Sequence, residues 1–101
     1  MFTLTIDAMG PGAVRLRLTG HLDDAAAREV LHAAADIVKG GCSRLVVDLD
    51  GITSFDEASA FAVVGCARLA RWLAQGVEVV ADAEPGRELA AQAGLVPALH
   101  A

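Results

Sequence analysis

The chain has 101 residues, of which 54% are hydrophobic and 4% aromatic, and its formal net charge is -5. This length supports one domain with one core, residues 1–101, and the hydrophobic content excludes a disordered chain. The acidic balance and the scarcity of aromatic side chains exclude nucleic acid as an expected partner, because phosphate contacts need a basic surface and unpaired bases stack on aromatic rings.

The sequence also bears on membranes and on redox state. The longest apolar run, Ala58–Ala67, is too short to span a bilayer. The first residues have neither the basic region nor the long apolar segment of a secretory signal. We therefore expect a cytoplasmic protein without direct membrane insertion. Cys42 and Cys66 do not have the spacing of a redox or zinc motif, so we expect two free thiols.

The first two elements are predicted to be paired strands. Apolar and polar side chains alternate over residues 2–7 and again over residues 14–19, which is typical of strands with one buried face. Gly10-Pro11-Gly12 lies between them and predicts a turn. The two segments are therefore expected to form an antiparallel hairpin.

The next segment is predicted to be a helix that Asp23 or Asp24 caps and Gly40-Gly41 ends. A short apolar strand, residues 45–49, and a loop follow. A second helix should begin near Asp56, with that side chain as its cap, and run to residue 73 or 74, with Trp72 on its apolar face.

The last elements are a strand over residues 77–81 and a helix over residues 87–93, which Gly94 ends. The order is β-β-α-β-α-β-α. Helical connections make the last three strands parallel, and right-handed crossovers place the helices on one face of the sheet. The expected fold is an α/β two-layer sandwich with a four-stranded mixed sheet.

Three motifs in this order resemble the STAS domain, the fold of bacterial anti-sigma factor antagonists. Gly20-x-Leu22-Asp23 is similar to the motif that ends the family's second strand. Residues 45–56, LVVDLDGITSFD, are similar to its strand, loop and phosphorylation motif. Residues 90–95, Ala-x-x-Ala-Gly-Leu, are similar to its closing helix. The resemblance covers nearly the whole chain and implies a STAS-like sandwich.

The resemblance also implies a switch that this chain lacks at its usual place. The family's motif is Asp-Ser-Ser/Thr-Gly, in which an anti-sigma factor with kinase activity phosphorylates the residue after the aspartate. Asp56 matches that aspartate, whereas Glu57 takes the acceptor position, Ala58 the second hydroxyl position and Ser59 the glycine position. Glu57 cannot be phosphorylated, and Ser59 is the candidate substitute acceptor.

Two interpretations of Glu57 stay open. A helix start carries unpaired N–H groups and the positive end of the helix dipole, where a phosphate is stabilised. Glu57 places a permanent single negative charge there and could mimic the phosphorylated state. An acidic residue in the first turn also stabilises a helix without any regulatory role. The two interpretations are compatible, because the same charge serves both.

Other site chemistries are less well supported. His21, Asp23 and Asp24 could suggest a metal site, but a strand-end turn accounts for all three. A catalytic triad of Ser59, His21 and Asp48 lacks the sequence pattern of a nucleophile elbow. Glycine-rich nucleotide motifs are absent from the sequence. We therefore expect no enzymatic activity, no metal and no cofactor.

The resemblance implies a regulatory protein-binding module whose partner is an anti-sigma factor of the serine kinase type, in a partner-switching system that controls transcription. The alternative is a cytoplasmic STAS subunit of a membrane transporter for lipids or anions. Whether the chain also forms a homodimer is left open. The expected partner-binding residues are Gly20, His21, Leu22, Asp23, Thr53, Ser54, Phe55, Asp56, Glu57, Ala58 and Ser59.

Overall fold

The computed structural model describes residues 1–94. Strand β1 (Phe2–Ala8) pairs antiparallel with β2 (Ala13–Leu22), which confirms the predicted hairpin. Apolar and polar side chains alternate between the two faces of the hairpin. Leu4 lies opposite Leu18 on the face toward the core, and Asp7 lies opposite Arg15 on the other face. There the Asp7 carboxylate accepts a hydrogen bond from the Arg15 guanidinium at 3.0 Å.

Helix α1 (Asp24–Lys39) begins and ends as predicted. Asp23 is its cap, because the backbone N–H of Ala26 donates to Asp23 Oδ1 at 2.8 Å. At the other end Gly41 has a φ of 91°, a left-handed conformation that glycine adopts without steric cost. The buried stripe of α1 consists of small and β-branched residues, so the helix lies close to the sheet: Ala26, Ala27, Val30 and Ala34.

Strand β3 (Arg44–Phe55) has 12 residues and is longer than the predicted strand over residues 45–49. The segment expected to be a loop, residues 51–55, continues beside β2 in parallel register, up to Leu22 opposite Phe55. Gly51 permits this approach, because a Cβ there would lie 2.8 Å from the carbonyl oxygen of Leu18. The long strand β2 thus supplies the hydrogen-bonding partner for the second half of β3, which the local sequence of residues 51–55 does not reveal.

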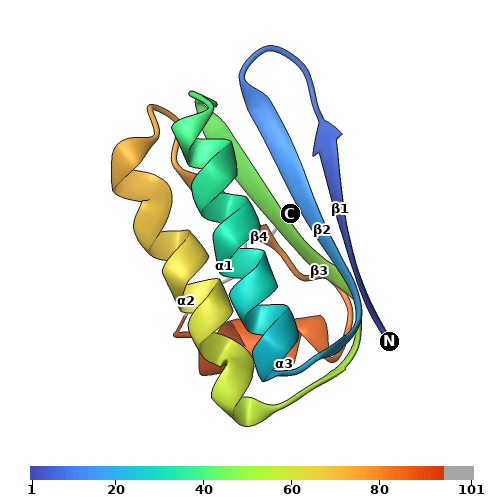
Figure 1. Cartoon of the computed structure of the whole chain (residues 1–101). Coiled ribbons are helices and arrows are strands. Elements are labelled where there is room, and N and C mark those ends of the chain that lie inside the picture. Colours follow the sequence, from blue (N-terminus) through green and yellow to red (C-terminus); the bar gives the residue numbers. More distant parts are fainter. Residues whose placement is uncertain (95–101) are drawn as a thin grey trace.

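Strand β4 (Val77–Val80) pairs parallel with the first half of β3 and completes a sheet in the order β1-β2-β3-β4. The mixed four-stranded sheet with three parallel strands agrees with the prediction. Helices α1 and α2 lie side by side in front of this sheet (Figure 1). The core between them is aliphatic, and its largest fully buried side chains include Leu16, Leu18, Leu22, Leu45, Leu49, Val63 and Leu89.

The predicted helix over residues 56–73 is divided into three parts. A 3₁₀ helix, η1 (Glu57–Ala60), precedes α2 (Phe61–Arg68), and a second 3₁₀ helix, η2 (Leu69–Trp72), follows it. A 3₁₀ helix has three residues per turn, so it rotates later side chains away from the stripe of the preceding α-helix. Trp72 accordingly leaves the apolar face and is 68% exposed beside Arg71.

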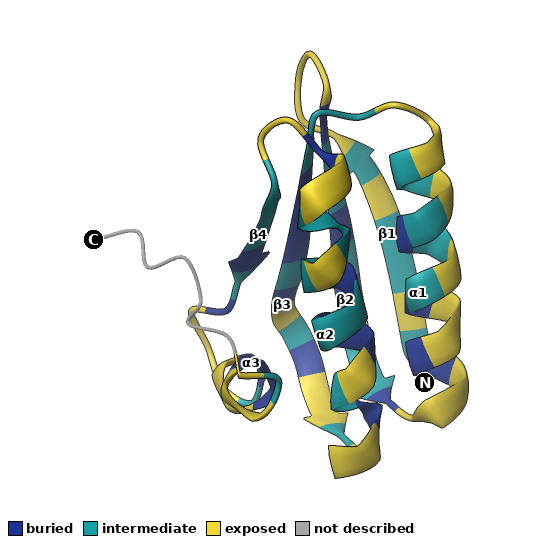
Figure 2. Cartoon of the chain, turned by 90° about the vertical axis from the view of Figure 1, so that its left-hand side faces the viewer, coloured by how far each residue is buried: buried dark blue, intermediate teal, exposed yellow. Residues whose placement is uncertain are grey.

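Helix α3 (Gly86–Gln92) lies beyond the end of β4, next to the second half of β3 (Figure 2). Gly86 permits this close contact, because a Cβ at that position would lie 2.6 Å from the carbonyl oxygen of Leu49. Leu89 and Ala90 bury the inner side of the helix. Because β4 is short, α3 covers the edge of β3 that leads to the candidate site. Leu95 of the closing motif lies outside the described residues.

Candidate functional site

Two of the motifs meet where β2 and β3 end. Parallel neighbouring strands bring their carboxyl ends to the same edge of a sheet. Here His21 lies opposite Ser54 and Leu22 lies opposite Phe55. The backbone N–H of Asp56 continues the contact by donating to the carbonyl oxygen of Leu22 at 3.0 Å. Two segments that the sequence assigned to one patch are therefore adjacent in space.

His21 connects the two segments through both of its ring nitrogens. Its Nδ1 lies 2.6 Å from Ser54 Oγ, and its Nε2 lies 3.2 Å from Asp56 Oδ1. The His21 side chain is 40% exposed and that of Asp56 is 56% exposed, so the three groups face solvent. Sequence reasoning placed all three residues in the patch but missed their contact, which depends on strand register over 33 positions.

The predicted capping role of Asp56 is wrong. Asp56 precedes η1 in an extended conformation, but its side chain makes no capping hydrogen bond. Only its backbone carbonyl serves the turn, by accepting from the N–H of Ser59 at 2.8 Å. The carboxylate turns toward His21 instead. The helix start that Asp56 would have capped is a 3₁₀ turn, whose first N–H groups are oriented differently from those of an α-helix.

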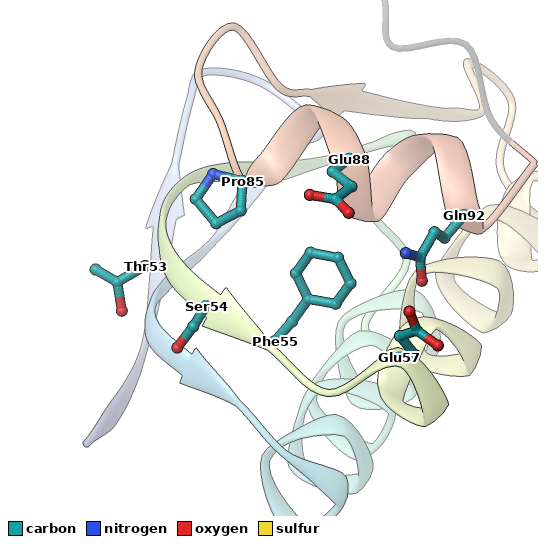
Figure 3. A pocket seen from close by; sticks show the side chains of 7 residues that line it. All are labelled: Thr53, Ser54, Phe55, Glu57, Pro85, Glu88 and Gln92. Carbon is teal, nitrogen blue, oxygen red and sulfur yellow. The ribbon is translucent and has the colours of Figure 1, made fainter.

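Glu57 is exposed at the first residue of η1 and faces α3. It lines an open pocket of about 290 Å³ between the end of β3, η1 and α3, together with Thr53, Ser54, Phe55, Pro85, Glu88 and Gln92. Figure 3 shows the Glu57 and Gln92 side chains pointing toward each other, with the Phe55 ring between Glu57 and Pro85. Two carboxylates, Glu57 and Glu88, make this pocket a poor place for an anion.

Ala58 is exposed, whereas Ser59 is fully buried. The Oγ of Ser59 has no hydrogen-bond partner among residues 1–94. A buried hydroxyl without a partner is destabilising, because it gives up its hydrogen bonds to water. A kinase could reach this hydroxyl only if η1 opened, which argues against Ser59 as a substitute acceptor in the folded protein.

The residues considered above for a metal site or a catalytic triad make other hydrogen bonds and ion pairs. Asp23 caps α1, and Asp24 pairs with Arg28 at 2.8 Å. Asp48 accepts a hydrogen bond from the backbone N–H of Asp50 rather than from a histidine. In the described part of the chain, no three His, Cys, Asp or Glu side chains converge as metal ligands. Within residues 1–94 no helix is both long and apolar enough to cross a membrane.

Solved structures share this fold. SpoIIAA in its unphosphorylated form, an anti-sigma factor antagonist, is 16% identical over 86% of this chain and 80% of its own, with a TM-score of 0.70. The phosphorylated form of Bacillus SpoIIAA is 16% identical over 97% and 93%, with a TM-score of 0.72. An anti-sigma factor antagonist from Mycobacterium paratuberculosis is 19% identical over 93% and 79%, with a TM-score of 0.77.

The family assignment comes from sequence. The family model described as "Mlab, STAS domain" matches residues 7–96, which is most of the chain. Comparison with curated protein sequences gives no match. The chain therefore belongs to the STAS domain family, as its motifs indicated.

Proposed function

We propose that this member of the STAS domain family is a regulatory module that acts by binding another protein, and that its partner is an anti-sigma factor of the serine kinase type. One observation carries the proposal: Gly20–Asp23 and Thr53–Ser59, the segments that resemble the antagonists' motifs, lie side by side at one end of the molecule. The fold shared with SpoIIAA and the mycobacterial antagonist supports the same role.

The chemistry of this end suits a protein partner. His21, Ser54, Asp56 and Glu57 present polar side chains around the half-buried ring of Phe55. An aromatic centre with a polar rim is the usual composition of a protein-binding surface.

Glu57 determines the state of the module in this proposal. SpoIIAA exists in unphosphorylated and phosphorylated forms. In this chain Glu57 supplies a permanent charge where the family's motif has its acceptor, although a carboxylate carries one charge and a phosphate about 1.5 to 2. The chain therefore corresponds to an antagonist held in the phosphorylated state. In such a system the protein acts in the cytoplasm of a bacterium and regulates transcription without catalysing a reaction.

Titration calorimetry tests the proposal. The intact chain is titrated into each kinase-type anti-sigma factor encoded in its source genome, and at least one should bind with a Kd in the micromolar range or below. The charge reversal Glu57→Arg should change that affinity at least tenfold. Asp36→Arg, a matched reversal on the exposed side of α1, should leave it unchanged. Binding to a transporter ATPase and to none of the anti-sigma factors would overturn the proposal.

A further inference from the structure

We propose that Ser54 is a nucleophilic serine at which this module accepts a phosphoryl group, with His21 as the base that removes its proton and Asp56 as the residue that positions His21. The proposal rests on the chain of contacts from Ser54 Oγ through the His21 ring to Asp56 Oδ1. It goes beyond the proposed function and does not depend on it, because the reactivity belongs to this chain alone.

The partners of His21 determine which ring nitrogen carries the proton. We assign the proton of the neutral ring to Nε2, because the Asp56 carboxylate, 3.2 Å from that nitrogen, can only accept a hydrogen bond. In the neutral ring Nδ1 then has a free lone pair. In this tautomer Ser54 Oγ, 2.6 Å away, donates its proton to that lone pair. This is the arrangement in which a histidine activates a serine, with a third group orienting the histidine.

The backbone holds the three residues in place. His21 and Ser54 are opposite each other in the parallel ladder of β2 and β3. Asp56 is fixed next to them, because its N–H donates to the carbonyl oxygen of Leu22. All three groups therefore lie on or directly after strands rather than in a long loop. Positioning of this kind lowers the entropy cost of bringing nucleophile and base together.

Exposure distinguishes Ser54 from the other hydroxyl of this region. Ser59 is fully buried, whereas Ser54 is exposed beside His21, and Figure 3 shows its hydroxyl pointing away from the Glu57 and Glu88 carboxylates. A donor carried by another protein can approach Ser54 without any opening of the fold. Thr53 is also exposed, but no hydrogen bond joins its hydroxyl to a histidine within residues 1–94. Thr19, which carries an exposed hydroxyl on β2 outside both motif segments, is the matched control.

The reaction balances with a nucleoside triphosphate as donor. Ser54 Oγ attacks the terminal phosphorus, the new O–P bond forms, and the bond from that phosphorus to the bridging oxygen breaks. The nucleoside diphosphate leaves with the bond's electron pair, and the serine proton passes to His21 Nδ1. The product places a phosphate of about -1.5 to -2 charge beside the imidazolium that this proton transfer forms. This end of the molecule supplies the nucleophile and the base, and the nucleoside triphosphate supplies the phosphoryl group.

A fluorophosphonate tests the nucleophile without any kinase. Diisopropyl fluorophosphate reacts by the same attack, with the P–F bond breaking and fluoride leaving. Intact mass and peptide mapping at constant pH should find one label, on Ser54. The label should be lost in Ser54→Ala, formed at least tenfold more slowly in His21→Gln, and unchanged in Thr19→Val. Labelling of Ser54 at the same rate in His21→Gln, or labelling spread over several hydroxyls, would overturn the proposal.

Two further measurements separate activation from folding. Labelling of the wild-type chain in a concentration of urea that unfolds it should be at least tenfold slower, since register brings His21 to Ser54. Nitrogen NMR of the His21 ring should show the proton on Nε2, and Asp56→Asn should shift the ring toward the other tautomer and slow labelling. Asp56→Glu should restore part of the rate. An unchanged tautomer and rate in Asp56→Asn would remove Asp56 from the positioning role.

Discussion

Asp23 and Asp56 both precede a helical segment, but only Asp23 caps one. Asp23 Oδ1 accepts from the Ala26 N–H at 2.8 Å, whereas the Asp56 carboxylate contacts His21 on the surface. Asp23→Ala should lower the free energy of unfolding by about 0.5–2 kcal/mol through loss of this cap. Asp56→Ala should cost less than about 1 kcal/mol, which is the range of exposed ion pairs. Urea denaturation measures both, and a larger loss in Asp56→Ala would contradict the assignment.

The two cysteines should differ in reactivity. Burial raises the pKa of the Cys66 thiol from 9.0 to about 12, whereas Cys42 is half-exposed. Since the thiolate is the reactive form, a disulfide reagent should modify one thiol in the native protein at pH 8 and two in denaturant. Peptide mapping should place the native label on Cys42. Rapid native labelling of Cys66 would contradict its burial.

The same shift predicts how stability depends on pH. The folded state keeps the Cys66 proton up to a pKa of about 12, while the unfolded chain loses it near 9.0. The free energy of unfolding therefore falls as pH rises from about 9 toward 12. The contribution of Cys66 to stability is fully present below pH 9. Cys66→Ala should remove this pH dependence from denaturation midpoints measured between pH 8 and pH 11. An equal alkaline loss in both proteins would exclude Cys66 as its source.

The charge of Glu57 is open to a direct comparison of substitutions. If it holds the module in a weakly binding state, Glu57→Gln and Glu57→Ser should both bind the anti-sigma kinase more tightly, by about 1–3 kcal/mol. Only Glu57→Ser should become phosphorylated at this position. Calorimetry and intact mass measure the two effects. Unchanged affinity in both variants would leave Glu57 as an ordinary first-turn acid that faces water.

At the scale of elements, sequence patterns predict the strands and helices whose formation depends on interactions within a short segment. The hairpin and α1 follow from alternation, apolar spacing and the Asp23 cap, all of which are contained in short segments. The length of β3 depends on β2 as a neighbour. The three helical parts over residues 57–72 contact α1, and α2 also contacts β4, so their packing involves segments far away in the sequence. The contact of His21 with Ser54 depends on the same register. The sequence could therefore suggest residues for a candidate site but not how their side chains contact one another.

Two glycines lie where helices pack closely against neighbouring elements. A Cβ on Gly86 would lie 2.6 Å from the Leu49 carbonyl oxygen, a backbone atom that cannot move without disturbing β3. A Cβ on Gly65 would meet Leu31 Cδ2 of α1, the end of a flexible side chain. Gly86→Ala should therefore lower the free energy of unfolding by about 1–3 kcal/mol. Gly65→Ala should cost clearly less, because alanine also favours the helix. Thermal denaturation that ranks them in the opposite order would contradict this packing.

For the whole molecule, the two motif segments lie at one end of the sheet. The hairpin turn lies at one end, and the ends of β2 and β3 lie at the other, next to α3 (Figure 1). The sheet and helices separate the two ends, and residues 20–23 and 53–59 both lie at the end next to α3. A partner that recognises those segments should therefore cover a single end of the molecule.

Hydrogen exchange with and without the anti-sigma factor tests this claim most directly. On binding, backbone amides of residues 20–23 and 53–59 should exchange at least tenfold more slowly, because the partner would cover them. Amides of the hairpin turn, residues 9–12, should exchange at unchanged rates and serve as the internal control. Protection of the hairpin turn with none at residues 20–23 and 53–59 would contradict the account.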